Sequence, residues 1–408
     1  MGQEMDLHRF FRADRFSADR PAVITREGSM TYGEMIERSL SLTVDGVSHM
    51  KFGLDCLTTI YACLMKNVTL IPIPRGAELS PSDKIVHKMP EGTAMLLFTS
   101  GSSGKPKGVC LSLDNILSDM MAIVEKYPHQ EGSLYLHVMP FTHIFGIISA
   151  LVALYEGCTL CLGGGLGSMV KDIRYFSPYA IDTVPEAAEY LLGRIEHDPE
   201  VTGGKLRVIA CGGAQVRAET ISGFSRYGIT VYGCYGMTEC SSCVSFADGE
   251  ATPGCAGRPL SCNEVMIGDD GQIYVRGSNV MLGYLDGDRS RFCGGWFRTG
   301  DRGFISNDGE LVVTGRADDI FVLDSGRNVT FSELRTILLE NRAVKDAVIR
   351  RSEGSTKIFV CRRDKTSAEI TLEMWIKSKL GENVMNSVII LDKEEYYCEA
   401  GKVRWRES

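Results

Sequence analysis

Short apolar runs alternate with segments of helical periodicity from about residue 94 onward. Met95–Thr99 is a short apolar run, and after a Ser/Gly-rich loop the apolar positions from Ile116 to Tyr127 recur at helical spacing. Strands that alternate with helices are typical of an α/β fold built on a largely parallel sheet. The further strands predicted by this pattern are Leu134–Met139, Thr159–Leu162, Ile181–Val184, Leu206–Cys211 and Thr230–Gly233, and the further helices are Ile144–Tyr155, Glu186–Glu196 and Ala218–Tyr227.

The pattern changes twice after residue 254. Asp270-Gly271 and Asp308-Gly309 suit turns with positive φ, so residues 254–316 are expected to form β-hairpins. Beyond them, a capping box at Thr330 and Glu333 predicts the start of a helix. Two strands and a second helix are predicted after it, at Asp346–Arg351, Thr356–Cys361 and Leu372–Leu380. We therefore predict a large N-terminal α/β domain, residues 1–316, with parallel-rich sheets and a β-rich subdomain, and a small C-terminal α+β domain, residues 319–408.

Composition and charge agree with this picture and exclude several classes of protein. The 408 residues exceed one usual core, and 44% hydrophobic with 24% charged residues is ordinary for a globular protein. A formal net charge of −8 leaves no evident basic face for nucleic acid or an anionic membrane. The longest near-apolar stretch, Ile144–Tyr155, is too short to span a bilayer, and the N-terminus lacks an apolar leader. We expect a cytoplasmic protein without a membrane span.

The fourteen cysteines are expected to be free thiols. Cys158/Cys161 and Cys240/Cys243 have C-x-x-C spacing, which leaves a structural zinc site as an alternative. The first pair lies in a predicted strand, where an offset of three points the two side chains to opposite faces and opposes shared ligation.

The strongest local signal is a loop that is expected to join an apolar strand to a helix. Its glycines let backbone N–H groups converge on an anion, its hydroxyls add donors, and Lys107 supplies charge, so it suits a phosphate. It lacks the ending of a Walker A loop, and a flexible surface turn is the alternative. The candidate phosphate-binding residues are Thr99, Ser100, Gly101, Ser102, Ser103 and Gly104, together with Lys107.

A second motif, Tyr235–Glu239, follows a predicted strand at the carboxyl end where open α/β sheets bind ligands. Because Mg²⁺ on a nucleotide takes one or two protein carboxylates, Glu239 is a candidate metal ligand. The alternative is a carboxylate at the start of a helix, favoured there by the helix dipole.

These two motifs stand in one order with Trp296–Asp301, Gly315–Asp319 and Gly401-Lys402. That order resembles the adenylate-forming superfamily, which includes acyl- and aryl-CoA ligases, luciferases and the adenylation domains of peptide synthetases. The resemblance covers about nine-tenths of the chain, although the stretch 45–70 lacks much of the family's first subdomain and the large domain is abbreviated at its start. It implies a ligase that uses ATP and Mg²⁺ to activate a carboxylic acid as an acyl adenylate and then transfers the acyl group to a phosphopantetheine thiol.

The resemblance also implies roles for the nucleotide-binding residues. The loop 99–108 would cradle the β- and γ-phosphates, Thr238 would touch the α-phosphate and Glu239 would hold Mg²⁺. Asp301 would accept hydrogen bonds from both ribose hydroxyls, and Arg316 would contact ribose or phosphate. The residues implied at the adenine are Gly212, Gly213, Ala214, Tyr235 and Gly236.

Lys402 and Asp318 would separate adenylate formation from transfer of the acyl group. Lys402 matches the lysine that reaches the reacting carboxylate and the α-phosphate, although the Pro and Thr that often precede it are absent here. Residues 317–318 form the implied hinge, with Asp318 at the position where a backbone rotation would swing the small domain.

The acid and the acceptor are less defined. His143 matches a position that lines the acyl pocket and contributes to catalysis, although a packing role is the alternative. No Asp occurs between residues 140 and 157 to pair an ammonium, so we expect a small acid, aryl or aliphatic, without an α-amine. The acceptor is CoA or, alternatively, an acyl carrier protein, and a nucleotide-binding member without turnover is the rival from another class. The expected pocket residues are His143, Phe145, Gly146, Val184, Cys234 and Met237.

Overall fold

The computed structural model describes most of the chain, and it divides into two compact units. The larger unit comprises Met1–Met266, Tyr274–Arg298 and Ile305–Val312, and the smaller unit Ile267–Ile273, Thr299–Phe304 and Val313–Ser408. The residues described are 10–11, 17–50, 52–74, 89–100, 106–127, 130–317, 319–325, 327–352, 355–362, 369–391, 396–399 and 402–405.

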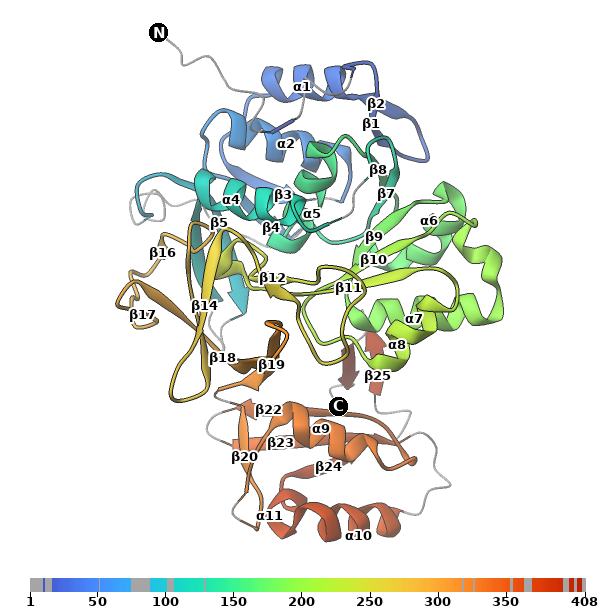
Figure 1. Ribbon diagram of the computed structural model, residues 1–408, viewed down its shortest axis with the longest axis vertical. Helices are drawn as coiled ribbons and strands as arrows, with labels where there is room; N and C mark the ends of the chain where they lie inside the picture. Colours follow the sequence, from blue (N-terminus) through green and yellow to red (C-terminus); the bar gives the residue numbers. More distant parts are fainter. Residues whose placement is uncertain are drawn as a thin grey trace. The chain divides into compact units, whose positions relative to one another are not determined.

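A nine-stranded sheet forms the centre of the larger unit, in the order β13-β12-β11-β10-β9-β7-β8-β1-β2 (Figure 1). The six strands from β11 to β1 in this order run parallel, and both edges end in antiparallel strands. The strands are β1 (Pro21–Ile24), β2 (Ser29–Thr31), β7 (Leu134–His137), β8 (Thr159–Leu162), β9 (Ala180–Thr183), β10 (Val208–Cys211), β11 (Thr230–Tyr235), β12 (Ser245–Phe246) and β13 (Arg258–Pro259). The predicted α/β fold with a parallel-rich sheet is confirmed.

Helices connect and cover these strands. A capping box at Ser112 and Asn115 starts α4, and a second one at Thr31 and Glu34 starts α1. The helix α5 packs on β7 and β8, whereas α7 and α8 pack on β10 and β11. The helices and 3₁₀ turns are α1 (Tyr32–Ser41), α2 (Leu54–Met65), α4 (Leu113–Val124), α5 (Ile144–Tyr155), η2 (Leu166–Ser168), α6 (Met169–Phe176), α7 (Pro185–His197), η3 (Pro199–Thr202), α8 (Ala218–Ser225) and η4 (Thr238–Cys240).

The segment that follows the Ser/Gly-rich loop corrects one expectation. The loop leads first into a strand, β6 (Pro106–Ser112), which pairs antiparallel with β5 (Thr93–Ser100), and α4 begins only after it. The physical reason is that Val109, Cys110 and Leu111 are completely buried, so this run gains more from pairing in a sheet than from an exposed turn of helix. A third strand, β16 (Gly283–Tyr284), completes the small sheet, and β3 (Val47–Met50) pairs separately with β4 (Ile71–Pro74).

The predicted hairpins lie in a further sheet. Gly271 has a φ of 72° in the turn before β15, and Gly309 has a φ of 79° in the turn before β19. Both predicted turns therefore use the left-handed region in which glycine is unstrained. The strands are β14 (Asn263–Ile267), β15 (Gln272–Gly277), β17 (Phe292–Cys293), β18 (Trp296–Ile305) and β19 (Leu311–Arg316).

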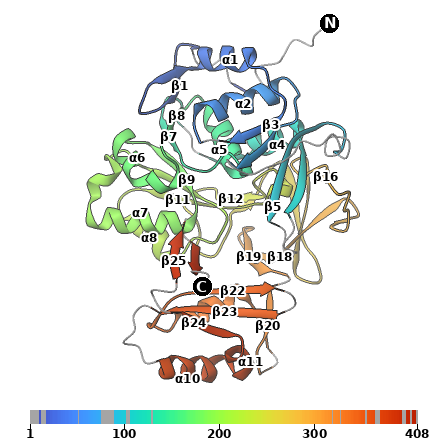
Figure 2. The same cartoon turned by 180° about the vertical axis from the view of Figure 1, so that it is seen from behind.

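The smaller unit has its own core, built from a three-stranded sheet and two longer helices (Figure 2). Leu334, Ile358, Val360 and Ile376 are fully buried in it. Its elements are β20 (Ile320–Val322), β21 (Asn328–Thr330), α9 (Phe331–Leu339), β22 (Val344–Ser352), β23 (Ser355–Arg362), α10 (Glu369–Leu380), α11 (Glu382–Met385), β24 (Val388–Leu391), β25 (Tyr396–Glu399) and β26 (Lys402–Trp405). The boundary at residues 317–318 stays a prediction.

Two further expectations concern membranes and metals. None of the helices in the described ranges is long and apolar enough to cross a bilayer. Burial raises the pKa of both the Cys158 and the Cys161 thiol to about 12, which disfavours the thiolate that zinc requires. Nor do the described residues contain a cluster of three or more potential metal ligands.

His137, the last residue of β7, is buried in an apolar environment. Its ring stacks on Phe52 and Phe141, with ring centroids 5.5 and 4.5 Å away, and the Met139 backbone opposes the effect of burial on its pKa only in part. Burial lowers the pKa of this imidazole to about 3. The native state therefore holds a neutral histidine at pH values where the unfolded chain binds a proton.

This difference predicts a pH-dependent loss of stability. As the pH falls below about 6.5, only the unfolded state protonates His137, so the free energy of unfolding should fall by about 1.4 kcal/mol per pH unit from this group, until the pH approaches its native pKa. A His137→Phe variant keeps an aromatic ring and removes the proton, so its stability should vary less with pH. Urea unfolding between about pH 7 and pH 4 measures the difference. The exposed His197 provides the control, since His197→Gln should leave the slope nearly unchanged, and an unchanged slope in His137→Phe would contradict the assignment.

Candidate active site in the larger unit

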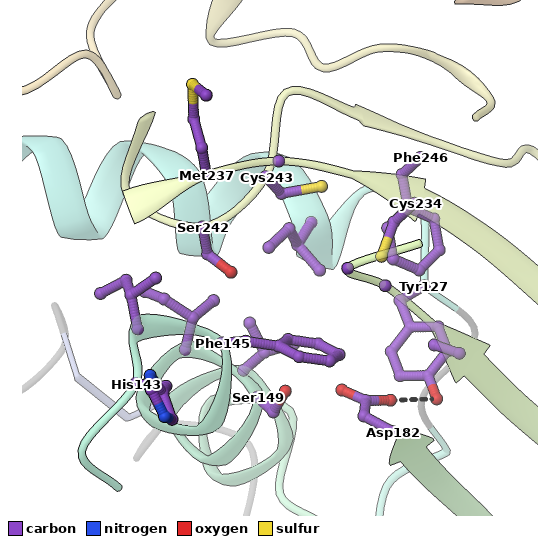
Figure 3. Close-up of a pocket in the computed structure, with 18 of the residues that line it drawn as sticks. Tyr127, His143, Phe145, Ser149, Asp182, Cys234, Met237, Ser242, Cys243 and Phe246 are labelled. Carbon is purple, nitrogen blue, oxygen red and sulfur yellow. Dashed lines mark hydrogen bonds between the residues drawn. The ribbon is translucent and has the colours of Figure 1, made fainter. Parts of the chain in front are cut away.

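A cavity of about 190 Å³ opens at the carboxyl ends of β9, β10 and β11, against the helix α5 (Figure 3). Its walls are mainly apolar. Phe145, Ile148 and Val152 contribute from α5, Ala210 from β10 and Phe246 from β12. The cavity therefore suits a small ligand with an apolar body.

Three glycines shape this cavity. A Cβ at Gly212 would lie 2.8 Å from the Cys234 sulfur, and a Cβ at Gly236 would lie 1.7 Å from the Ser242 carbonyl oxygen. Gly213 has a φ of 87°, which any other residue would adopt only with strain. A side chain is therefore disfavoured at each of the three positions, by a clash at Gly212 and Gly236 and by the backbone conformation at Gly213.

One end of the cavity carries a polar group that the sequence analysis missed. Asp182, in the middle of β9, is buried, and the Tyr127 hydroxyl donates to its Oδ1 at 2.8 Å. The Ser149 hydroxyl points toward the same carboxyl group (Figure 3). Burial raises the pKa of Asp182, while the hydroxyls of Tyr135, Ser149 and Tyr127 act in the opposite direction. An acidic residue inside an otherwise apolar parallel strand was the signal available in the sequence.

A second polar group connects Lys107 with Glu239. The Tyr284 hydroxyl donates to Glu239 Oε1 at 2.8 Å, and the Lys107 ammonium lies 4.8 Å from the centre of the Tyr284 ring. The same ammonium donates to Asp288 Oδ2 at 2.9 Å. The structure thus brings together a cation predicted for phosphate and a carboxylate predicted for a metal ion.

The environment of this group explains two pKa shifts. Burial, together with the neighbouring Glu239 carboxylate, raises the pKa of the Tyr284 phenol, so it remains a hydrogen-bond donor. The hydrogen bond from Lys107 lowers the pKa of Asp288, so this carboxyl is ionised over the physiological range. Tyr284 and Asp288 were not predicted, because neither belongs to a motif recognised in the sequence.

Comparison with known proteins shows the family to which the chain belongs. The family model described as AMP-binding enzyme matches residues 69–285, more than half of the chain. The chain belongs to this family of AMP-binding enzymes. The resemblance to adenylate-forming enzymes noted in the sequence is thereby confirmed.

Curated relatives of this AMP-binding chain are CoA ligases. It is 30% identical over 272 residues to a 2-succinylbenzoate–CoA ligase of Bacillus pumilus, a match that covers 62% of this chain and 55% of the relative. It is 24% identical over 342 residues to the long-chain-fatty-acid–CoA ligase FadD15 of Mycobacterium bovis, covering 70% and 56%. The chain spans a little more than half the length of these relatives.

Solved structures share the fold. An o-succinylbenzoate CoA synthetase from Bacillus subtilis, in complex with its acyl-adenylate intermediate, has a TM-score of 0.76 at 22% identity, covering 94% of this chain and 93% of that one. ATP-bound MatB from Rhodopseudomonas palustris has a TM-score of 0.79 at 21% identity, covering 95% of each chain.

The residues predicted for the acyl pocket of this AMP-binding chain lie at or near the cavity. His143, Phe145, Cys234 and Met237 line it. Gly146 lies in α5, where a Cβ would come within 2.4 Å of the Pro140 carbonyl oxygen, and it is not among the lining residues described. Val184 precedes α7 and packs against the hydrophobic core; it is not among the lining residues described, although a Cβ at the lining Gly213 would lie 3.9 Å from its side chain.

The residues predicted for the nucleotide are distributed over three places. Thr238, Gly212, Gly213 and Gly236 line the cavity, Tyr235 ends β11 and Ala214 is exposed after Gly213. Thr99 lies in β5 opposite Lys107. Ser100 ends that strand, with its side chain outside the description, and the remaining four residues of the loop lie outside the described residues: Gly101, Ser102, Ser103 and Gly104.

The remaining predicted residues belong to the smaller unit. The Arg316 guanidinium donates to Asp301 Oδ1 at 3.0 Å, and Asp301 is buried. Lys402 is the first residue of β26, and its side chain lies outside the description. Asp318 lies outside the described residues.

Proposed function

We propose that this protein is an AMP-forming acid–thiol ligase that activates a small carboxylic acid as its adenylate and transfers the acyl group to CoA. The observation that carries the proposal is the cavity itself. Its glycine turns and Thr238 lie at the ends of parallel strands, and the same unit holds Lys107 and Glu239 on either side of Tyr284. The curated relatives named above, which act as CoA ligases, add support.

The first half-reaction requires two anions to meet. A carboxylate oxygen attacks the α-phosphorus of ATP, the bond to the bridging oxygen breaks, and pyrophosphate leaves with that electron pair. No protein nucleophile is needed, so positioning and cationic stabilisation supply the catalysis. In this proposal Lys107 exchanges Asp288 for the β- and γ-phosphates, together with the loop 99–104.

Glu239 fits a hard cation, because it is a partly exposed carboxylate whose Oε1 is oriented by the Tyr284 hydroxyl. Mg²⁺ bound there would neutralise phosphate charge. In the same proposal, Thr238 contacts the α-phosphate, and Tyr235 with Gly212, Gly213 and Ala214 surrounds the adenine. Asp301 and Arg316 contact the ribose.

The second half-reaction would form the thioester. The CoA thiolate attacks the adenylate carbonyl, and AMP leaves with the electron pair of the broken C–O bond. Lys402 would serve only the first step, and rotation at Asp318 would exchange the two arrangements. His143, which is exposed at the start of α5, would line the acyl entrance.

A carrier protein is the alternative acceptor, and a non-catalytic nucleotide-binding protein is the alternative without turnover. The decisive experiment is acid-dependent exchange of labelled pyrophosphate into ATP over a panel of acids, followed by thioester assays with CoA and with a holo carrier protein in parallel. Exchange without thioester on CoA would move the acceptor to the carrier protein. Binding of ATP without exchange for any acid would refute the ligase.

Lys402→Ala should abolish adenylate formation and leave thioester formation from supplied acyl adenylate largely intact, because the lysine is proposed to contact only the first transition state. Pyrophosphate exchange and a single-turnover thioester assay measure the two steps separately. Lys379, exposed on α10, offers a matched control in Lys379→Ala. Equal loss of both steps in the Lys402 variant would refute this division of labour.

Tyr284→Phe should raise the Mg²⁺ concentration needed for half-maximal pyrophosphate exchange by about 10-fold, since it removes the hydroxyl that orients Glu239. Activity at saturating Mg²⁺ should recover to a large extent. Tyr274→Phe, on β15 of the same unit, is the control. A Mg²⁺ requirement that stays the same in Tyr284→Phe would show that Glu239 does not depend on this contact.

A further inference from the structure

We propose that Asp182 determines which acids enter the cavity, by selecting those that carry a hydrogen-bond donor, a hydroxyl or amino group, at the end remote from the reacting carboxylate. This inference rests on the proposed ligase function and names its substrate class more closely.

The position of Asp182 is the first argument. Successive residues of a strand face opposite sides of the sheet. Ile181 and Ile209 belong to the core packed under α7 and α8. Asp182 and its parallel neighbour Ala210 instead line the cavity. The carboxyl group is thus part of the ligand-facing wall, and Asp182 supplies the one carboxyl group among the lining residues that the structure describes.

The direction of the cavity is the second argument. His143 and Met237 lie toward one side of the view, Asp182 and Tyr127 lie toward the other, and the Phe145 ring stands between them (Figure 3). Met237 directly precedes Thr238, which the proposed function places at the α-phosphate. An acid whose carboxylate lies near Thr238 therefore directs its tail past Phe145 toward Asp182.

The cost of burial is the third argument. A buried carboxyl group is destabilising unless hydrogen bonds compensate it. Tyr127 donates to Oδ1, and Ser149 faces the group from α5. A donor on the ligand would add a hydrogen bond, whereas a methyl group would displace water and offer none. A second carboxylate would place two acids together in an apolar surround, so dicarboxylic acids should be rejected.

The size of the cavity limits the remainder of the acid. About 190 Å³ is below the roughly 300–1,000 Å³ typical of pockets for drug-sized ligands. One aromatic ring or a short chain fits this space better than a long acyl chain. The class selected is thus a compact hydroxy- or amino-substituted acid with the substituent opposite the carboxylate.

The test compares acids within two series, one of para-substituted benzoates and one of six-carbon aliphatic acids. Acid-dependent pyrophosphate exchange is measured with para-hydroxybenzoate, para-aminobenzoate, para-toluate and terephthalate, and with hexanoate, its terminally hydroxylated analogue and adipate. In the natural protein, kcat/KM should favour the hydroxyl or amino acid over the methyl acid of the same series by about 10- to 100-fold. The dicarboxylic acids should be the poorest substrates.

Two variants separate specificity from folding. Asp182→Leu should reduce the preference for hydroxyl over methyl by about 10- to 100-fold, and Asp182→Asn, which keeps shape and hydrogen bonding, should retain part of it. Asp198→Asn, outside the cavity, should leave the ratio unchanged. Thermal unfolding of each variant and calorimetric titration with the acids show folding and binding without turnover.

The outcomes are distinct. Exchange with several acids but no preference for a donor in the natural protein would overturn the inference and leave the ligase function standing. A folded Asp182→Leu that kept the preference would overturn it in the same way, because Asp182 would then be a structural residue held by Tyr127. Absence of exchange with every acid would refute the ligase function, and with it this inference.

Discussion

The site depends on the parallel pairing of β9, β10 and β11 and on the largely apolar helix α5, which lines the same cavity. The register Ala180↔Val208↔Thr230 aligns the strands, so their carboxyl ends meet at one edge of the sheet. Nearly every residue of α5 is buried, which fixes this helix against the sheet without a polar face to turn toward solvent. Replacement of a single buried isoleucine of α5, such as Ile147, by alanine would lower the free energy of unfolding by about 2–5 kcal/mol. Any resulting shift of the helix would also move the cavity wall.

Much of this arrangement follows from the sequence by simple rules. The bounds of α5 and β8 coincide with those expected, because Ile144–Tyr155 is a nearly continuous apolar run between His143 and Glu156, and Thr159–Leu162 is a short, mainly apolar run between Gly157 and Gly163. The hairpin turns at Gly271 and Gly309 were likewise evident from their dipeptides. The strand β6 was missed because Pro106 and Gly108 suggest a turn, and only its partner β5 makes the extended form favourable.

The site was less accessible to sequence reasoning than the fold. Motif residues such as Thr238 and Gly212 were found because they stand in a recognisable order. Tyr284 and Asp182 were not, since their importance comes from which side chains the fold brings beside them. The stretch 140–157 contains no Asp that could pair an ammonium, whereas the structure supplies a carboxyl group to the cavity from β9. Strand pairing brings together residues that are far apart in the chain, and such contacts cannot be predicted from a local sequence pattern.

The two polar groups described at the site, Lys107 with Asp288 and Glu239, and Asp182, differ in how far water can reach them. Lys107, Asp288 and Glu239 are partly exposed, so water can replace any partner they lose, and their contacts can exchange at modest cost during a reaction. Asp182 is buried, and water cannot replace its partners so readily. A side chain that must release and rebind phosphate is best placed where water can reach it. A side chain that distinguishes between the remote ends of different acids is more selective when it is buried. The depth of each carboxyl group in the structure therefore matches the chemistry proposed for it.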